Sequence, residues 1–374
     1  MAFRGRLADW PAFVGAFMER HAITAVLMHS EQRPYHHEAA AEAQRRGIDV
    51  IVTELGYLRP DWMTIEKYGN SVDSLFPTDP DTIRALAAGV PDVDTAVRYP
   101  REAGLETVDD LKTNLANVFL WFTYPHYRQH GLYHPFVAYA RFLWREGQLS
   151  RRNAAARAVR DRLAAPFFLF AMQTDTDFQI RTNSQYADTT EALTEVFASF
   201  AAHAPAETRL VVKKHPGDLG PVHWAERVPQ LAAAAGIAGR VAFVDGLPMS
   251  EWTHDAAGLV TINSSAGLDG LAAGIPTITL SPAIYDVPGL TAQQPLDAFW
   301  AAPQVPDPTL FAAYRKALAA SIQVRGTIYS RAGTRAAAEA MANRILTGTV
   351  NAPDPADRTP PRYARAGALG IRPR

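Results

Sequence analysis

Residues 167–177 read FFLFAMQTDTD, and this stretch decides the fold class of the chain. An apolar run of strand length that ends in a polar cluster is typical of a strand buried on both faces of a parallel sheet. Similar runs recur at 210–213, 241–244, 258–262 and 277–280, and helical patterns separate them at 188–203, 222–236, 248–255 and 265–273. This alternation indicates βαβ units, so we predict a Rossmann-like domain over 166–330.

The same alternation starts before this domain but is less complete. Runs at 24–28 and 49–53 read as strands on either side of a helix at 34–46, and residues 80–165 read mostly as helices. We predict a first Rossmann-like domain over 1–165, with a helical insertion at 80–165. Its pattern starts midway, so we expect its first strand to be missing. The fold class predicted for the chain is α/β, with two Rossmann-like domains.

The end of the sequence has a different character. Residues 331–346 predict one more helix. Residues 347–374 are rich in proline, arginine and alanine and show no apolar period, so we predict a disordered tail there.

The bulk composition excludes several classes of protein. A length of 374 residues suits two domains, and a net charge of −1 provides no broad positive field to attract nucleic acid. The chain has no cysteine, which excludes disulfides and cysteine-bound zinc. Its start lacks the apolar segment of a signal peptide, and no apolar run reaches about 18 residues. We expect a soluble, cytoplasmic protein without a nucleic-acid partner.

Ligands of open parallel sheets bind outside the carboxyl ends of the strands, so the residues that follow each strand are the first candidates. Gln173, Asp175 and Asp177 follow the first strand of the second domain. Two acids held close raise the pKa of one of them, which then acts as an acid while the other acts as a nucleophile or base. The alternatives are a helix cap, a turn or a weak divalent-metal site; nothing else in the sequence has the pattern of a metal site.

A basic cluster follows the strand at 210–213. Lys214 and His215, next to Lys213 and before Pro216, suit a nucleotide phosphate or a sugar carboxylate. The alternative is a solvated lysine pair followed by a turn.

Two further strand ends carry small or polar residues. Asn263, Ser264 and Ser265 open a helix, where backbone N–H groups and the helix dipole favour an anion; a plain helix cap is the alternative. Tyr285 and Asp286 lie in a loop shaped by two prolines and a glycine, and Asp286 is either a ligand contact or a turn former.

The first domain contributes three candidates. Glu54 is a possible general base, Arg59 could hold a carboxylate through two hydrogen bonds, and Glu66 adds a polar group farther along. Each of them alone could be a surface residue.

Taken together, these motifs resemble the capsular polysaccharide biosynthesis and export family, whose members are β-Kdo transferase-like. The resemblance covers roughly residues 20–330, and it is carried in order by residues 54–60 (ELGYLRP), 173–177 (QTDTD), 214–216 (KHP), 263–265 (NSS) and 283–290 (AIYDVPGL). It implies a GT-B-like, retaining glycosyltransferase that transfers Kdo from CMP-Kdo to a (lyso)phospholipid or Kdo-linker acceptor. It implies no cofactor beyond the donor, and contact with the inner membrane or with capsule assembly proteins.

The resemblance also implies roles for individual residues. Asp177 would be the nucleophile, and His215 with Pro216 would bind the CMP phosphate. The family's acidic pair before a glycine would supply the acid/base; here Leu55 replaces the second acid, which leaves Glu54. Two other functions stay open: a non-catalytic accessory protein of capsule export, and a glycosyltransferase or epimerase that uses a different nucleotide sugar.

Aromatic residues are frequent at 109–147. They would form either an apolar wall for a lipid acceptor or an ordinary helical core. Their spacing does not make a clean amphipathic face, so we expect the core.

Overall fold

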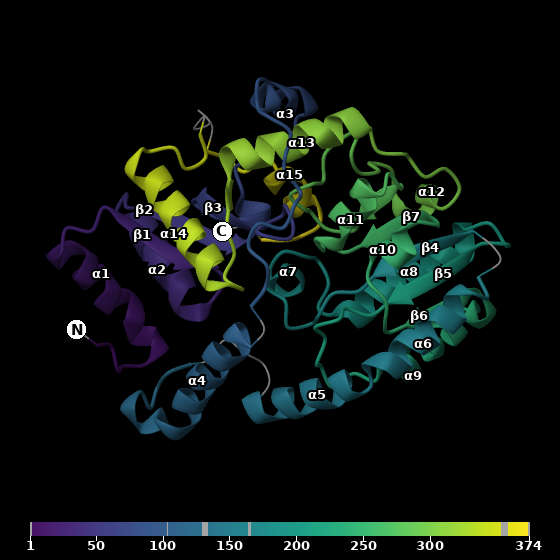
Figure 1. Cartoon of the computed structure of the whole chain (residues 1–374), viewed down its shortest axis with the longest axis horizontal. Coiled ribbons are helices and arrows are strands. Elements are labelled where there is room, and N and C mark those ends of the chain that lie inside the picture. The colour runs from purple at the N-terminus through teal and green to yellow at the C-terminus, as the bar shows by residue number, and fades with distance from the viewer. Residues whose placement is uncertain (1, 103, 129–133, 164–165, 353–357, 373–374) are drawn as a thin grey trace. The chain divides into compact units, whose positions relative to one another are not determined.

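The computed structural model describes residues 2–102, 104–128, 134–163, 166–352 and 358–372. The chain divides into two compact units (Figure 1). The first unit comprises Met1–Pro77, Arg84–Leu132 and Ala313–Pro361; the second comprises Thr78–Ile83, Tyr133–Ala312 and Arg362–Arg374. The chain passes between them after Pro77, within helix α3 (Pro80–Ala87), after Leu132, within helix α13 (Pro308–Ser321) and after Pro361.

The second unit is built on a parallel sheet with the strand order β6-β5-β4-β7-β8. These strands span Val241–Val244, Arg209–Lys213, Phe167–Ala171, Ala256–Thr261 and Thr277–Thr279. The helices of this unit are α5 (Pro135–Gly147), α6 (Leu149–Arg160), α7 (Phe178–Arg181), α8 (Thr189–His203), α9 (Trp224–Ala234), α10 (Ser250–Thr253), α11 (Ala266–Ala272), α12 (Leu296–Phe299) and α15 (Tyr363–Ala368).

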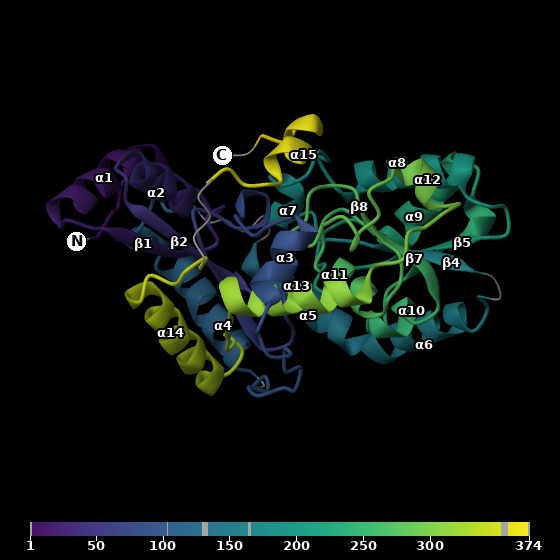
Figure 2. The same ribbon diagram turned by 90° about the horizontal axis from the view of Figure 1, so that it is seen from above.

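Both faces of this sheet are covered, as apolar strands require (Figure 2). Phe168 and Phe170 point to one face and pack against α8, α9 and α12. Phe167 and Leu169 point to the other face and pack against Ala156 of α6 and Trp252 of α10. The βαβ fold predicted from residues 167–280 is therefore confirmed.

The first unit has a mixed sheet with the order β1-β2-β3-β9. β1 (Ala25–His29) and β2 (Asp49–Leu55) are parallel, whereas β3 (Trp62–Lys67) is antiparallel to β2 and to β9 (Gln323–Arg325). Helices α1 (Trp10–Arg20) and α2 (Pro34–Arg45) cover one face, and α14 (Arg331–Leu346) covers the other. The α/β class in two units is confirmed, but β3 and β9 were not predicted.

The units differ from the predicted division in two places. Residues 313–330, predicted for the second domain, belong to the first unit, where β9 pairs with β3. Helices α5 and α6, predicted for the first domain, belong to the second unit. The reason is packing: Ala156 of α6 lies in the same apolar cluster as Phe167 of β4. α4 (Leu105–Phe119) remains in the first unit.

Two expectations about single segments were wrong. The predicted disordered tail contains helix α15 and the buried residues Arg362, Ala366 and Ile371. The aromatic residues of 109–147 do not form a core: in the described part of this segment, Trp121 is 63% exposed and Trp144 is 68% exposed.

None of the helices in the described part of the chain is both long and apolar enough to cross a membrane.

Candidate functional site

A cavity of about 470 Å³ lies at the carboxyl edge of the sheet in the second unit. It is lined from the ends of three strands: by Lys213, Lys214 and His215 after β5, by Asp245 after β6, and by Ser264 and Ser265 after β7. Glu146, Arg152 and Asn153 of α5 and α6 complete the wall. This is the edge at which parallel sheets bind ligands.

Lys213, the last residue of β5, is the most buried cation of this cavity, with 4% of its surface exposed. Burial lowers the pKa of its ammonium group, while Asp245 and Asp269 raise it to a smaller extent. Within the part of the chain that the structure describes, the ammonium group forms neither an ion pair nor a hydrogen bond. A buried cation in that state favours an anionic ligand.

Lys214 is engaged differently. Its ammonium nitrogen lies 3.3 Å from the Asp218 carboxylate, which also accepts a hydrogen bond of 3.0 Å from the Trp224 indole. The charge of Lys214 is therefore partly balanced within the protein. The sequence predicts Lys214 as the phosphate contact, whereas the burial of Lys213 and the ion pair of Lys214 favour Lys213.

The surroundings of His215 favour its neutral form. Burial lowers its pKa, and the positive charges of Lys213 and Arg145 lower it further, although Asp218 raises it. A pKa below 6.5 favours the uncharged ring at neutral pH. Its Nδ1 atom accepts a hydrogen bond of 3.1 Å from the Gly217 backbone N–H. The proton of the neutral ring is therefore on Nε2, which can donate to a ligand.

Asp245, which follows β6, binds arginines of the two helices α5 and α6 that complete the cavity wall. Arg145 donates to both of its carboxylate oxygens, at 2.8 and 3.0 Å, and Arg152 donates to one of them at 2.9 Å. Burial alone would raise the pKa of this carboxyl group, but Arg145, Lys214 and Arg152 lower it overall. Sequence reasoning missed this cluster because α5 was assigned to the other domain.

The two predicted catalytic acids of this unit both accept hydrogen bonds from the starts of helices. Asp175 accepts hydrogen bonds from the Thr189 N–H at 2.9 Å and from the Thr189 hydroxyl at 2.5 Å. Asp177 is the N-cap of α7 and accepts from the Gln179 N–H at 2.9 Å. Neither lines the cavity.

Gln173 and Asn263 bind each other at the ends of β4 and β7. The Gln173 amide donates to Asn263 at 2.9 Å and accepts from the Asn263 N–H at 3.1 Å. The Asn263 amide nitrogen donates to the carbonyls of Gln179 and Asn183. Because these groups are used within the protein, we do not include the two side chains among the proposed ligand contacts.

The last two candidates of this unit also make internal contacts. The Tyr285 hydroxyl donates to the Ser264 carbonyl, and Asp286 forms an ion pair with Arg365. Ser264 and Ser265 do line the cavity.

In the first unit, Glu54 lies beside His29 at the carboxyl ends of the parallel pair β1 and β2. Its carboxylate is 3.7 Å from the His29 Nε2 atom and accepts from the Leu55 N–H at 3.0 Å. Burial lowers the pKa of His29 overall, although Glu54 raises it. Sequence reasoning missed His29 because it ends the strand one residue beyond the predicted run.

The other two candidates of the first unit lie in different surroundings. Arg59 is exposed. Glu66 is fully buried in β3 and accepts a hydrogen bond from the Ser74 hydroxyl, so it is a core residue.

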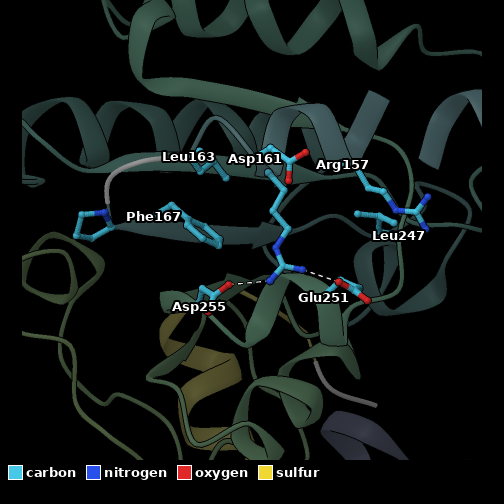
Figure 3. Close-up of a pocket in the computed structure, with 9 residues that line it drawn as sticks. Arg157, Asp161, Leu163, Phe167, Leu247, Glu251 and Asp255 are labelled. Carbon is cyan, nitrogen blue, oxygen red and sulfur yellow. Dashed lines mark hydrogen bonds and ion pairs between the residues drawn. The ribbon is translucent and has the colours of Figure 1, made fainter. Parts of the chain in front are cut away.

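A larger cavity, of about 610 Å³, lies at the amino end of β4 (Figure 3). Arg160 lines it and pairs with Glu251 at 2.5 Å and Asp255 at 2.7 Å. None of the predicted site residues lines it. We therefore place the candidate site at the carboxyl edge.

Comparison with known proteins gives matches that extend over most of the chain. Residues 24–329 match the family described as capsule polysaccharide biosynthesis protein. The chain is 31% identical over 335 residues to the capsule polysaccharide export protein KpsS of Escherichia coli, covering 86% of this chain and 83% of that protein. It is 30% identical over 346 residues to the capsule polysaccharide modification protein LipB of Neisseria meningitidis serogroup A, covering 88% and 81%.

Solved structures match more weakly. A β-Kdo 2,7 transferase, KpsC of Thermosulfurimonas dismutans, has 14% sequence identity and a TM-score of 0.45, with coverage of 90% of this chain and 89% of that chain. The UDP-bound structure of MnaA from S. aureus has 10% identity and a TM-score of 0.34, with coverage of 93% and 80%.

Proposed function

We propose that this chain, which belongs to the capsule polysaccharide biosynthesis family, is a glycosyltransferase that binds a nucleotide sugar at the carboxyl edge of its second unit. The observation that carries the proposal is the Lys213 ammonium group, buried in the wall of the cavity next to a neutral His215. An anionic phosphate is the ligand chemistry that this pair fits.

The pair would act on the leaving group. When a sugar leaves its nucleotide, negative charge grows on the phosphate oxygens. A cation and an N–H donor already placed there, in surroundings with little water, stabilise that charge without further rearrangement. Arg145, Arg152 and Asp245 together carry one further positive charge beside the same cavity.

We propose CMP-Kdo as the donor, with retention of the β configuration. Asp177 would attack the anomeric carbon: the sugar–phosphate bond breaks, CMP leaves with the electron pair, and a covalent glycosyl-enzyme forms. The acceptor hydroxyl then attacks that carbon, the bond to Asp177 breaks, and Glu54 takes the hydroxyl proton. A (lyso)phospholipid or a Kdo linker would be the acceptor.

The exposed aromatic residues of the first unit support a lipid-linked acceptor. Phe119, Trp121 and Phe122 are each more than half exposed at the end of α4 and just beyond it. Residues 111–128 contain no acid, and Arg128 is exposed at the end of this segment. Aromatic and basic residues together suit the surface of an anionic membrane.

A binding measurement tests the donor site first. The purified chain is titrated with CMP, UDP and ADP, and the melting temperature is followed, since a ligand of the folded state raises it. We expect stabilisation by CMP. Lys213→Met should weaken CMP binding by at least about tenfold, because it removes a buried charge from the phosphate.

The control is Lys112→Met, which removes an exposed lysine from the first unit. CMP binding should be unchanged in that variant. Stabilisation by UDP alone would favour a different nucleotide sugar, and no response to any nucleotide would favour an accessory protein. Equal CMP affinity of Lys213→Met and the unaltered chain would exclude Lys213 from the site.

A further inference from the structure

The C-terminal segment of the chain packs on the second unit through two arginines. Arg362, which is 2% exposed, donates to the carbonyl oxygens of Ala283 at 3.0 Å and Ile284 at 2.7 Å. Arg365, one turn later in α15, donates to the Thr279 carbonyl at 2.5 Å and forms an ion pair with Asp286. The helix (α15 in Figure 1) therefore holds the loop that follows β8, the last strand of the sheet.

Both carboxylate oxygens of Asp286 have partners within the protein. One carboxylate oxygen meets Arg365, and the other accepts hydrogen bonds from the Thr291 hydroxyl at 2.9 Å and the Gln293 amide at 3.3 Å. Asp286 is 8% exposed. The carboxylate of Asp286 therefore fixes this loop, which also contains Tyr285.

Tyr285 connects this loop to the candidate cavity. Its hydroxyl group donates to the Ser264 carbonyl, and its ring packs so closely on α11 that a Cβ atom at Gly267 would lie 2.2 Å from the hydroxyl oxygen. Ser264 and Ser265, at the start of α11, line the cavity. One continuous set of contacts therefore runs from α15 through the loop to the cavity wall.

We propose that Arg362 and Arg365 are positioning residues for the nucleotide cavity. They hold residues 283–286, Tyr285 holds the start of α11, and the wall formed by Ser264 and Ser265 keeps the shape that binds the ligand. The part of this proposal that concerns the nucleotide rests on the proposed function. The part that concerns the wall does not.

Two measurements on the full chain test it. In Arg365→Ala, amide hydrogen exchange of the segments 283–291 and 264–269 should become faster, because the loop loses its ion pair and the wall loses its support. The CMP dissociation constant, measured well below the melting temperature of each variant, should rise about tenfold. Arg365→Lys, which keeps the charge but not the planar fork, should recover part of both effects.

The control is Arg372→Ala, an exposed arginine of the same segment, which should change neither measurement. If Arg365→Ala does not fold, Asp286→Asn removes the same ion pair with almost no change of volume. A purely structural role would lower the melting temperature and leave the dissociation constant at low temperature unchanged.

Unchanged exchange of 264–269 in a folded variant would overturn the proposal. If the unaltered chain does not bind CMP, the proposed function fails; the exchange of 264–269 still decides whether α15 supports the wall.

Discussion

At the scale of single residues, burial makes two histidines sensors of pH. Burial lowers the pKa of His215 and His29 below the ordinary value of 6.5. The unfolded chain therefore takes up protons first as the pH falls. The free energy of unfolding should be at its full value above pH 6.5 and decrease between 6.5 and the lower folded pKa values.

Urea unfolding at a series of pH values checks this. His215→Gln should flatten the pH dependence, since it removes one of the two groups. His254→Gln, whose side chain is 81% exposed, is the control and should leave the slope as it is. If the free energy of unfolding depends on pH in the same way in His215→Gln and in the unaltered chain, a lowered pKa of His215 is contradicted.

A glycine provides the second prediction at this scale. A methyl group at Gly267 would meet the ring and hydroxyl of the buried Tyr285. Gly267→Ala should lower the free energy of unfolding by about 1–3 kcal/mol, the usual cost of overpacking. Gly147→Ala, where no atom lies within 4 Å of the added carbon, should be neutral or slightly stabilising. Equal stabilities of the two variants would mean that the contact with Tyr285 relaxes freely.

At the scale of elements, Asp245 links α5 and α6 to the end of β6. It is the common partner of Arg145 and Arg152. Asp245→Ala leaves both guanidinium groups without this partner, so we expect a loss of about 3–5 kcal/mol in the free energy of unfolding. Asp109→Ala breaks only the exposed pair with Lys112 and should cost less than about 1 kcal/mol. Similar losses in both variants, measured by urea unfolding, would argue against the role of Asp245.

At the scale of the whole molecule, the question is whether the chain transfers a sugar. Asp177→Asn should lower transfer from CMP-Kdo by about a thousandfold or more, because an amide cannot act as the nucleophile. Asparagine caps a helix as well as aspartate does, so α7 and CMP binding should be retained. The measurement compares transfer rates and CMP affinity of the variant and the unaltered chain.

The matched control is Asp188→Asn, the same chemical change at the N-cap of α8. It should transfer at the normal rate. Near-normal transfer by Asp177→Asn would remove Asp177 from the mechanism and leave it as a cap.

The sequence alone determined the class of fold and indicated the edge at which we place the candidate site. Runs such as 167–172 and 210–213 are apolar over the length of a strand and are followed by polar groups. That pattern depends only on neighbours along the chain, and the carboxyl ends of parallel strands meet at one edge whatever the details of packing.

The tertiary structure decided everything that depends on distant partners. Strand β3 is paired with β9, more than 250 residues later, and α15 is ordered by contacts with the loop at 279–286. Lys213 and Lys214 are chemically alike in the sequence; only the fold buries the first in a cavity and brings Asp218 to the second. Burial and ion pairing are properties of the surroundings, and residues far apart in the chain create those surroundings.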